Sequence, residues 1–140
     1  MVILAIDYGD SRTGLAFCQA HEAIASPLGT IFEKSPEKCF QKLLEKAKNI
    51  SAELIVVGHP VNMDGSIGER AKKCEALAKR LEQESGIKAV LWGERVTTVQ
   101  AIGILNDANV RGKKRKEVID TVAATLILES YLEYRHKKDH

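Results

Sequence analysis

Three short, uninterrupted apolar runs constrain the fold of this chain more than any other feature. They are MVILAID at residues 1–7, ELIVVGHP at 53–60 and IKAVLWGE at 87–94. A strand that is buried on both faces lacks the usual alternation of polar and apolar residues, and such strands are typical of parallel sheets covered by helices. We therefore predict that these three runs form the parallel centre of a sheet.

Two helical patterns separate these runs. Ser35 is a typical N-cap residue for an amphipathic helix over 36–50. Ser66 and Glu69 form an S-x-x-E pattern, which we interpret as the capping box of a second helix, and Gly86 ends that helix. Helices in these places supply the crossovers that parallel strands require.

The remaining segments complete the predicted fold. Residues 12–20 and 22–32 are mixed in polarity and rich in turn residues, which is typical of an antiparallel meander. A short helix is predicted from Thr97 to about Asn106, and a long one over 117–134. We predict an α/β fold whose mixed five-stranded sheet has strands 1–3 antiparallel, strands 1, 4 and 5 parallel, and helices on both faces.

Length and composition place the chain among ordinary globular domains. A chain of 140 residues buries roughly two-thirds of its unfolded surface, so we predict one domain over 1–140. Its apolar runs are far shorter than a bilayer span, and no signal peptide pattern is present, which predicts a cytoplasmic protein without a membrane partner. The three cysteines are scattered, with no CxxC pair, and therefore indicate neither a zinc knuckle nor a disulfide framework.

Acidic residues stand where the central strands end. Asp7 follows the first apolar run and Glu94 ends the third. The carboxyl ends of parallel strands meet at one edge of a sheet, where such folds bind ligands. Asp120 interrupts an otherwise apolar helix and shares a face with Ala123 and Ala124, whose small side chains let that face approach the sheet. We predict that the three acids meet at this edge.

Each acid also has an ordinary structural interpretation. Asp7 can form a turn, Glu94 can be an exposed strand end, and Asp120 can be a rim carboxylate favoured by the helix dipole. Two carboxylates ~5 Å apart repel by about 3 kcal/mol at an effective dielectric constant of 20, so a cluster of three needs a cation or a proton. Oxygen ligands favour Mg²⁺ or Mn²⁺, ions that support phosphodiester hydrolysis. This interpretation makes Asp7, Glu94 and Asp120 both the metal ligands and the catalytic residues.

Basic residues indicate where a nucleic acid would lie. The net charge of +2 is too small to imply such a partner, but RGKKRK at 111–116 has five cations in six positions. We interpret this run as a solvated loop that can also contact phosphates. The candidate nucleic-acid-binding residues are Arg12, Arg95, Arg111, Lys113, Lys114, Arg115 and Lys116, of which Arg12 and Arg95 are equally suited to salt bridges.

Four segments together resemble the YqgF family, in order and spacing, over nearly the whole chain. They are IDYGDSRTGLA, IVVGHPVNMDGSIGERA, GERVTTVQA and RKEVIDTVAATLILESYL. The resemblance implies an RNase H-like fold of the RuvX type. It also implies nuclease activity, either on the 5′ end of pre-16S ribosomal RNA or as a Holliday junction resolvase. In the family pattern, the residues matching Asp7, Glu94 and Asp120 bind the metal.

This chain departs from the family pattern at three positions. The family often has Asp where Gly93 stands, usually has Leu where His59 stands, and commonly has a basic residue where Ser11 stands. We therefore interpret His59 as incidental rather than as a general base.

Three functions remain open at this point. The first is a metal-dependent endonuclease, acting on RNA or DNA as a monomer or weak homodimer. The second is an ATPase of the actin-like class, whose phosphate loop DYGDSRTG resembles, although that class needs two such lobes. The third is an RNA-binding module without catalysis.

Overall fold

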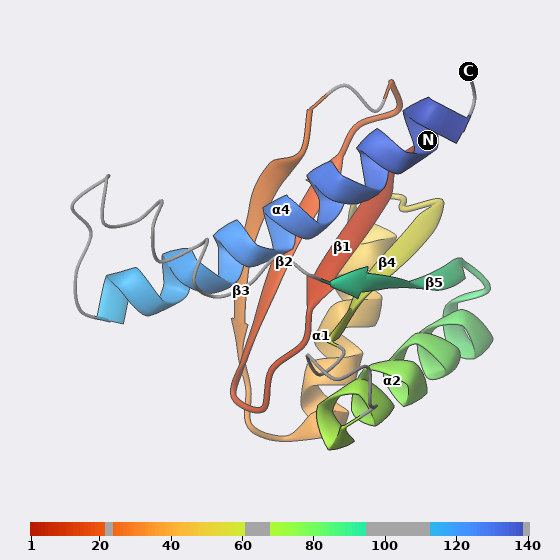
Figure 1. The fold of residues 1–140 in the computed structure, drawn as a ribbon. Helices are drawn as coiled ribbons and strands as arrows, with labels where there is room; N and C mark the ends of the chain where they lie inside the picture. The colour runs from red at the N-terminus through yellow and green to blue at the C-terminus, as the bar shows by residue number, and fades with distance from the viewer. Residues whose placement is uncertain (22–23, 61–67, 95–112, 139–140) are drawn as a thin grey trace.

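Five strands form one mixed sheet in the order β3-β2-β1-β4-β5. The structure is a computed structural model that describes residues 1–21, 24–60, 68–94 and 113–138, with the backbone alone at 94, 113–120 and 138 (Figure 1). β1 runs antiparallel to β2, and β2 to β3, whereas β1, β4 and β5 are parallel, which confirms the predicted topology. The strands are β1 (Ile3–Asp7), β2 (Arg12–Cys18), β3 (Ser26–Phe32), β4 (Leu54–Pro60) and β5 (Lys88–Glu94).

Helices cover both faces of this sheet, as predicted. α1 (Pro36–Asn49) and α2 (Glu69–Ser85) pack on one face, and α4 (Lys113–Lys138) packs on the other. Figure 1 shows α4 crossing diagonally in front of β3, β2 and β1, with α1 behind the sheet. The described helices thus divide the interior into an α1/α2 side and an α4 side.

β1 shows why the first apolar run has no polar positions. Leu4 and Ile6 are buried in the core under α1 and α2, while Ile3 and Ala5 are buried in the core under α4. Both sets are fully shielded from solvent. Because alternate side chains enter two different cores, every position of the strand has to be apolar until it reaches the edge of the sheet.

α4 is attached to the sheet near both edges. The hydroxyl oxygens of Thr121 and Thr30 lie 3.0 Å apart, which joins α4 to β3. The indole Nε1 of Trp92 donates a hydrogen bond to Ser130 Oγ at 3.1 Å, which joins α4 to β5. The Trp92 ring also meets Tyr131 edge-on, with centroids 5.3 Å apart. These contacts set how α4 lies across the strands.

Part of the basic run is helical, which corrects the prediction of a loop. α4 begins at Lys113, so residues 113–116 form its first turn. Lysine and arginine have high helix propensity, and a run of them carries no backbone signal for a loop. Residues 111–112 and the helix predicted from Thr97 lie outside the described residues.

The two predicted helix starts have different outcomes. Ser35 caps α1, and its side chain accepts a hydrogen bond from the Lys38 amide. The capping box predicted for α2 is wrong, because Glu69 is the first helical residue and Gly68 is the N-cap, with no side-chain hydrogen bond. A capping box would need Glu69 at the third helical position.

Two further predictions are that the chain has no membrane-spanning segment and that its cysteines form no disulfide framework. Within the described ranges, no helix combines the length and apolar character that crossing a membrane requires. The three cysteines are all free, in agreement with the absence of a disulfide framework from the sequence, and all are buried: Cys18, Cys39 and Cys74.

Candidate functional site

β1, β4 and β5 end at one edge of the sheet. In the parallel register, Ile6 lies beside Val57, and Val57 lies beside Leu91. The next row across the sheet therefore contains Asp7 and Trp92, and Glu94 ends β5 two residues beyond that row. The predicted placement of Asp7 and Glu94 at a common edge is thus observed for their backbone positions.

Strand alternation puts both positions on the α4 side. Ile3 and Ala5 belong to the α4-side core, and Asp7 continues their series as a half-buried residue. In β5, Val90 and Trp92 pack on the same core, and position 94 continues that series. The ends of β1 and β5 thus share one face as well as one edge.

α4 places the backbone of residue 120 over the row of the sheet that contains Asp7. Asp7 pairs with Gly14, and Gly14 pairs with Thr30. Thr30 in turn contacts Thr121, the neighbour of Asp120, through the 3.0 Å hydroxyl contact. The backbone at position 120 therefore lies over the row that contains Asp7.

The helix itself fits this close approach. Ala124 is fully buried and Ala123 is 7% exposed, so the small-residue face predicted from the sequence does pack on the sheet. Asp120 is the eighth residue of α4, beyond the first turn where the helix dipole favours an acid. The dipole therefore does not account for an acid at this position.

Convergence of the three carboxylates stays a prediction. The structure describes the Asp7 side chain, but for Glu94 and Asp120 it describes the backbone alone. Among the side chains that are described, no group of three His, Cys, Asp or Glu residues could hold a metal ion. Two of the three predicted ligands, Glu94 and Asp120, are not among those side chains.

A tight turn follows Asp7. A Cβ atom at Gly9 would lie 2.2 Å from the carbonyl oxygen of Arg12, so this close approach requires glycine. The Gly9 amide donates to the buried Thr13 hydroxyl at 3.4 Å, and Arg70 donates to the Tyr8 carbonyl at 2.8 Å. Arg70 is not among the predicted site residues: it lies in the segment IVVGHPVNMDGSIGERA, but nothing in that pattern indicates a contact with a residue 62 positions earlier.

The candidate nucleic-acid-binding residues are only partly placed. Arg12 begins β2 as a half-buried residue, and alternation with Ala16 and Cys18 puts it on the α4 side, as for Asp7. Arg95 and Arg111 lie outside the described residues. The remaining four candidates occupy the start of α4, where the backbone alone is described: Lys113, Lys114, Arg115 and Lys116.

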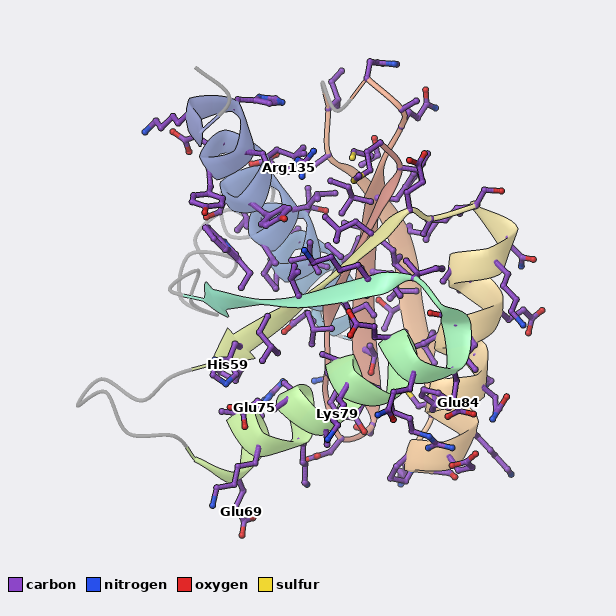
Figure 2. The ribbon with its side chains drawn as sticks, turned by 90° about the vertical axis from the view of Figure 1, so that its right-hand side faces the viewer. His59, Glu69, Glu75, Lys79, Glu84 and Arg135 are labelled. Atoms are coloured by element: carbon purple, nitrogen blue, oxygen red, sulfur yellow. The ribbon has the colours of Figure 1, made fainter. Side chains whose placement is uncertain are left out.

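His59 lies on the opposite side of the sheet from Asp7. Its Nε2 is 3.2 Å from the Glu75 carboxylate of α2, but the pair lacks hydrogen-bond geometry. Figure 2 shows the two side chains next to each other. This placement agrees with the interpretation of His59 as incidental. Gly93 pairs with His59 in the sheet, so the aspartate that the family often has there would also lie on the α2 side. Its absence removes no acid from the face that contains Asp7.

Comparison with known families and relatives gives one consistent result. Residues 1–134 match the model of a family described as "RuvX: Holliday junction resolvase". A protein of Lachnospira eligens named "Putative pre-16S rRNA nuclease" is 40% identical over 141 residues, covering 98% of this chain and 100% of the relative. A protein of the same name from Halothermothrix orenii is 39% identical over 137 residues, covering 98% of each chain.

Solved structures share the fold at low sequence identity. RuvC of T. thermophilus in complex with a Holliday junction substrate superposes with a TM-score of 0.61 at 15% identity, covering 98% of this chain and 96% of that one. The fowlpox virus resolvase in complex with Holliday junction DNA gives a TM-score of 0.60 at 12% identity, covering 96% and 98%. The likeness confirms the RNase H-like fold predicted from the sequence.

Proposed function

The chain belongs to the RuvX family of Holliday junction resolvases, and we propose that it is a divalent-metal-dependent endonuclease that processes the 5′ end of pre-16S ribosomal RNA. The RNA substrate is preferred because relatives at about 40% identity over almost the full length are named for it. The structures bound to DNA junctions share only 15% and 12% identity with this chain. Such processing would take place in the cytoplasm.

One observation carries the proposal. β1 and β5 end at the same edge and on the same side of the sheet, and the contact between Thr30 and Thr121 holds the α4 backbone at position 120 over the row that contains Asp7. Segments far apart in the sequence would thus supply acidic positions to the edge of the sheet at which β1 and β5 end. Carboxylates brought close together repel one another unless a cation or a proton lies among them, so such an arrangement supports a metal-binding role.

The donor set fits a hard divalent cation. Asp7, Glu94 and Asp120 offer only carboxylate oxygens, the ligands that Mg²⁺ and Mn²⁺ prefer. When bound, such an ion supplies an activated water and stabilises charge on the phosphate oxygens. The protein's part is to hold the carboxylates in place on two strand ends and one helix.

Basic residues near this face would position the substrate. Arg12 lies on the same side of the sheet as Asp7, within the segment that follows the Gly9 turn. Lys113 to Lys116 place four cations in the first turn of α4, on the helix that contributes Asp120. Contacts to phosphates orient a nucleic acid without reading its sequence, which suits a nuclease that recognises structure.

The test is cleavage by matched variants. Asp7→Asn should abolish cleavage of a precursor 16S rRNA fragment in Mn²⁺ while leaving the melting temperature unchanged or raised, because it removes one charge from an acidic cluster. Glu129→Gln makes the same carboxylate-to-amide change at an exposed position of α4 and should cleave like wild type. Metal-dependent cleavage by Asp7→Asn at the wild-type rate would refute the proposal.

Holliday junction resolution is the second candidate, because the family model is described by that activity. The same assay with a four-way DNA junction, run beside the precursor rRNA, decides between the two substrates. A two-fold junction favours a dimeric enzyme, whereas we expect a monomer or weak dimer in analytical ultracentrifugation. Tight RNA binding without cleavage in Mg²⁺ or Mn²⁺ would instead indicate a binding module, and heat on ATP titration would indicate the ATPase.

A further inference from the structure

A pocket of about 420 Å³ lies on the other side of the sheet from Asp7. It opens between α1, α2 and the turn after β1, and its wall includes Tyr8, Asp10, Lys34, Phe40, Lys73 and Arg80. Successive residues of a strand point to opposite faces, and Tyr8 packs against the α1/α2 core while Asp7 belongs to the α4 side. The pocket therefore begins one residue beyond the candidate active site.

The rim of the pocket suits an anion. Lys34 and Lys73 contribute two positive charges, and Asp10 contributes one negative charge. Lys73 Nζ lies 3.4 Å from Asp10 Oδ1, but the two side chains are 56% and 89% exposed. Exposed pairs of this kind are weak, so an incoming phosphate can compete for the lysine.

Arg80 gives the pocket a fixed planar surface. Its guanidinium lies 3.8 Å from the centroid of the Phe40 ring. Glu37 of α1 and Glu84 near the end of α2 hold it at 2.7 Å and 2.8 Å. These carboxylates compensate the charge of Arg80 and fix its orientation, and the side chain remains 42% exposed. Nucleic-acid-binding proteins stack unpaired bases on guanidinium planes of this kind.

We propose that this pocket binds one unpaired nucleotide of a single-stranded segment next to the cleavage site, with its base on Arg80 and its phosphate on Lys34 and Lys73. The inference rests on the proposed nuclease function, because it treats the pocket as an extension of the substrate path across the sheet edge. Its volume lies in the range of roughly 300–1,000 Å³ that is typical of small-ligand sites.

The test measures binding of an eight-nucleotide single-stranded RNA by fluorescence anisotropy, without divalent metal and over a series of salt concentrations. Lys73→Ala should reduce the slope of log affinity against log salt by about 0.7, the value for one phosphate contact on a single strand. Lys79→Ala removes the same charge from an exposed position of α2 that does not line the pocket (Figure 2), and it should leave the slope unchanged.

A second variant tests the base contact. Ala76 lies on the exposed wall of the pocket, so Ala76→Trp should fill the space with little effect on folding. We expect it to weaken RNA binding about tenfold, within the usual range for losing one stacked base. An unchanged melting temperature would show that the loss does not come from unfolding.

Two outcomes would overturn the inference. One is equal salt slopes for Lys73→Ala and Lys79→Ala, together with wild-type affinity for Ala76→Trp. The other is adenosine monophosphate binding that Ala76→Trp removes while RNA affinity stays unchanged, which would assign the pocket to a free nucleotide. Because these measurements need no cleavage, failure of the nuclease proposal would appear separately, in the Asp7→Asn assay.

Discussion

Replacing Gly9 with alanine should disturb the candidate active site through the backbone alone. Gly9 lies two residues beyond Asp7, and an alanine Cβ there would meet the carbonyl oxygen of Arg12 at 2.2 Å. Real Cβ atoms essentially never approach closer than 3.0 Å, so the turn has to open by about 0.8 Å. The opening also strains the hydrogen bond from Arg70 to the Tyr8 carbonyl.

The size of the effect follows from this displacement. Backbone shifts forced by added methyl groups cost about 1–3 kcal/mol, which corresponds to a fall in melting temperature of roughly 3–10 °C for a domain of this length. A misplacement of ~1 Å near reacting groups can lower a rate by about 10²-fold. We therefore expect Gly9→Ala to lose far more activity than stability.

Gly93→Ala is the matched control. Gly93 lies near the end of β5 at the same edge of the sheet, but a Cβ there would meet nothing within 4 Å. We expect its free energy of unfolding to change by no more than about 0.5 kcal/mol and its cleavage rate to stay near wild type. Thermal denaturation and single-turnover cleavage measure both quantities. If Gly9→Ala matched Gly93→Ala in both assays, the reasoning from the close approach to Arg12 would be wrong.

Three further predictions concern stability and reactivity. In a double-mutant cycle with Thr30→Val and Thr121→Val, chemical denaturation should give a coupling energy of about 1 kcal/mol, and additive effects would contradict the hydroxyl contact. Hydrogen bonds from Arg80 and Gln41 lower the pKa of Glu37, so Glu37→Gln should be less stable than wild type at pH 7. Because the stabilisation from a depressed carboxyl pKa is lost as the pH falls through it, the two melting curves should converge below the ordinary value of 4.5. Burial raises the pKa of Cys39, and the thiol reagent DTNB should react with the native protein slowly and with the unfolded protein at every cysteine: Cys18, Cys39 and Cys74.

The sheet could be predicted because its signals repeat along the chain. Each central strand lies between two cores, so several consecutive positions have to be apolar, as in Ile3 to Ile6. The order of strands and crossovers then leaves few topologies for a mixed sheet. The place of Asp7 at the end of β1 could be predicted for the same reason, since the first polar residue after a doubly buried strand marks where that strand leaves the interior.

The two wrong predictions, the capping box of α2 and the basic loop, each rested on one short sequence pattern. Ser66 and Glu69 have the spacing of a capping box, but the same spacing arises by chance, and the helix starts at Glu69. The basic run shows charge, and charge does not distinguish a loop from a helical turn. Contacts such as Arg70 with Tyr8, 62 residues apart, leave no periodic trace, so only coordinates can identify them.

The indole at position 92 gives the protein a built-in optical probe. It is the sole tryptophan of the chain, and it is anchored to Ser130 and packed against Tyr131. Fluorescence excited at the red edge of its absorption therefore arises from one site, at the junction of the final helix and the last strand. Detachment of that helix would expose the ring to water and move its emission to longer wavelengths. Stopped-flow fluorescence could thus measure how fast α4, the helix that contains Asp120, packs onto the sheet during refolding or after mixing with RNA.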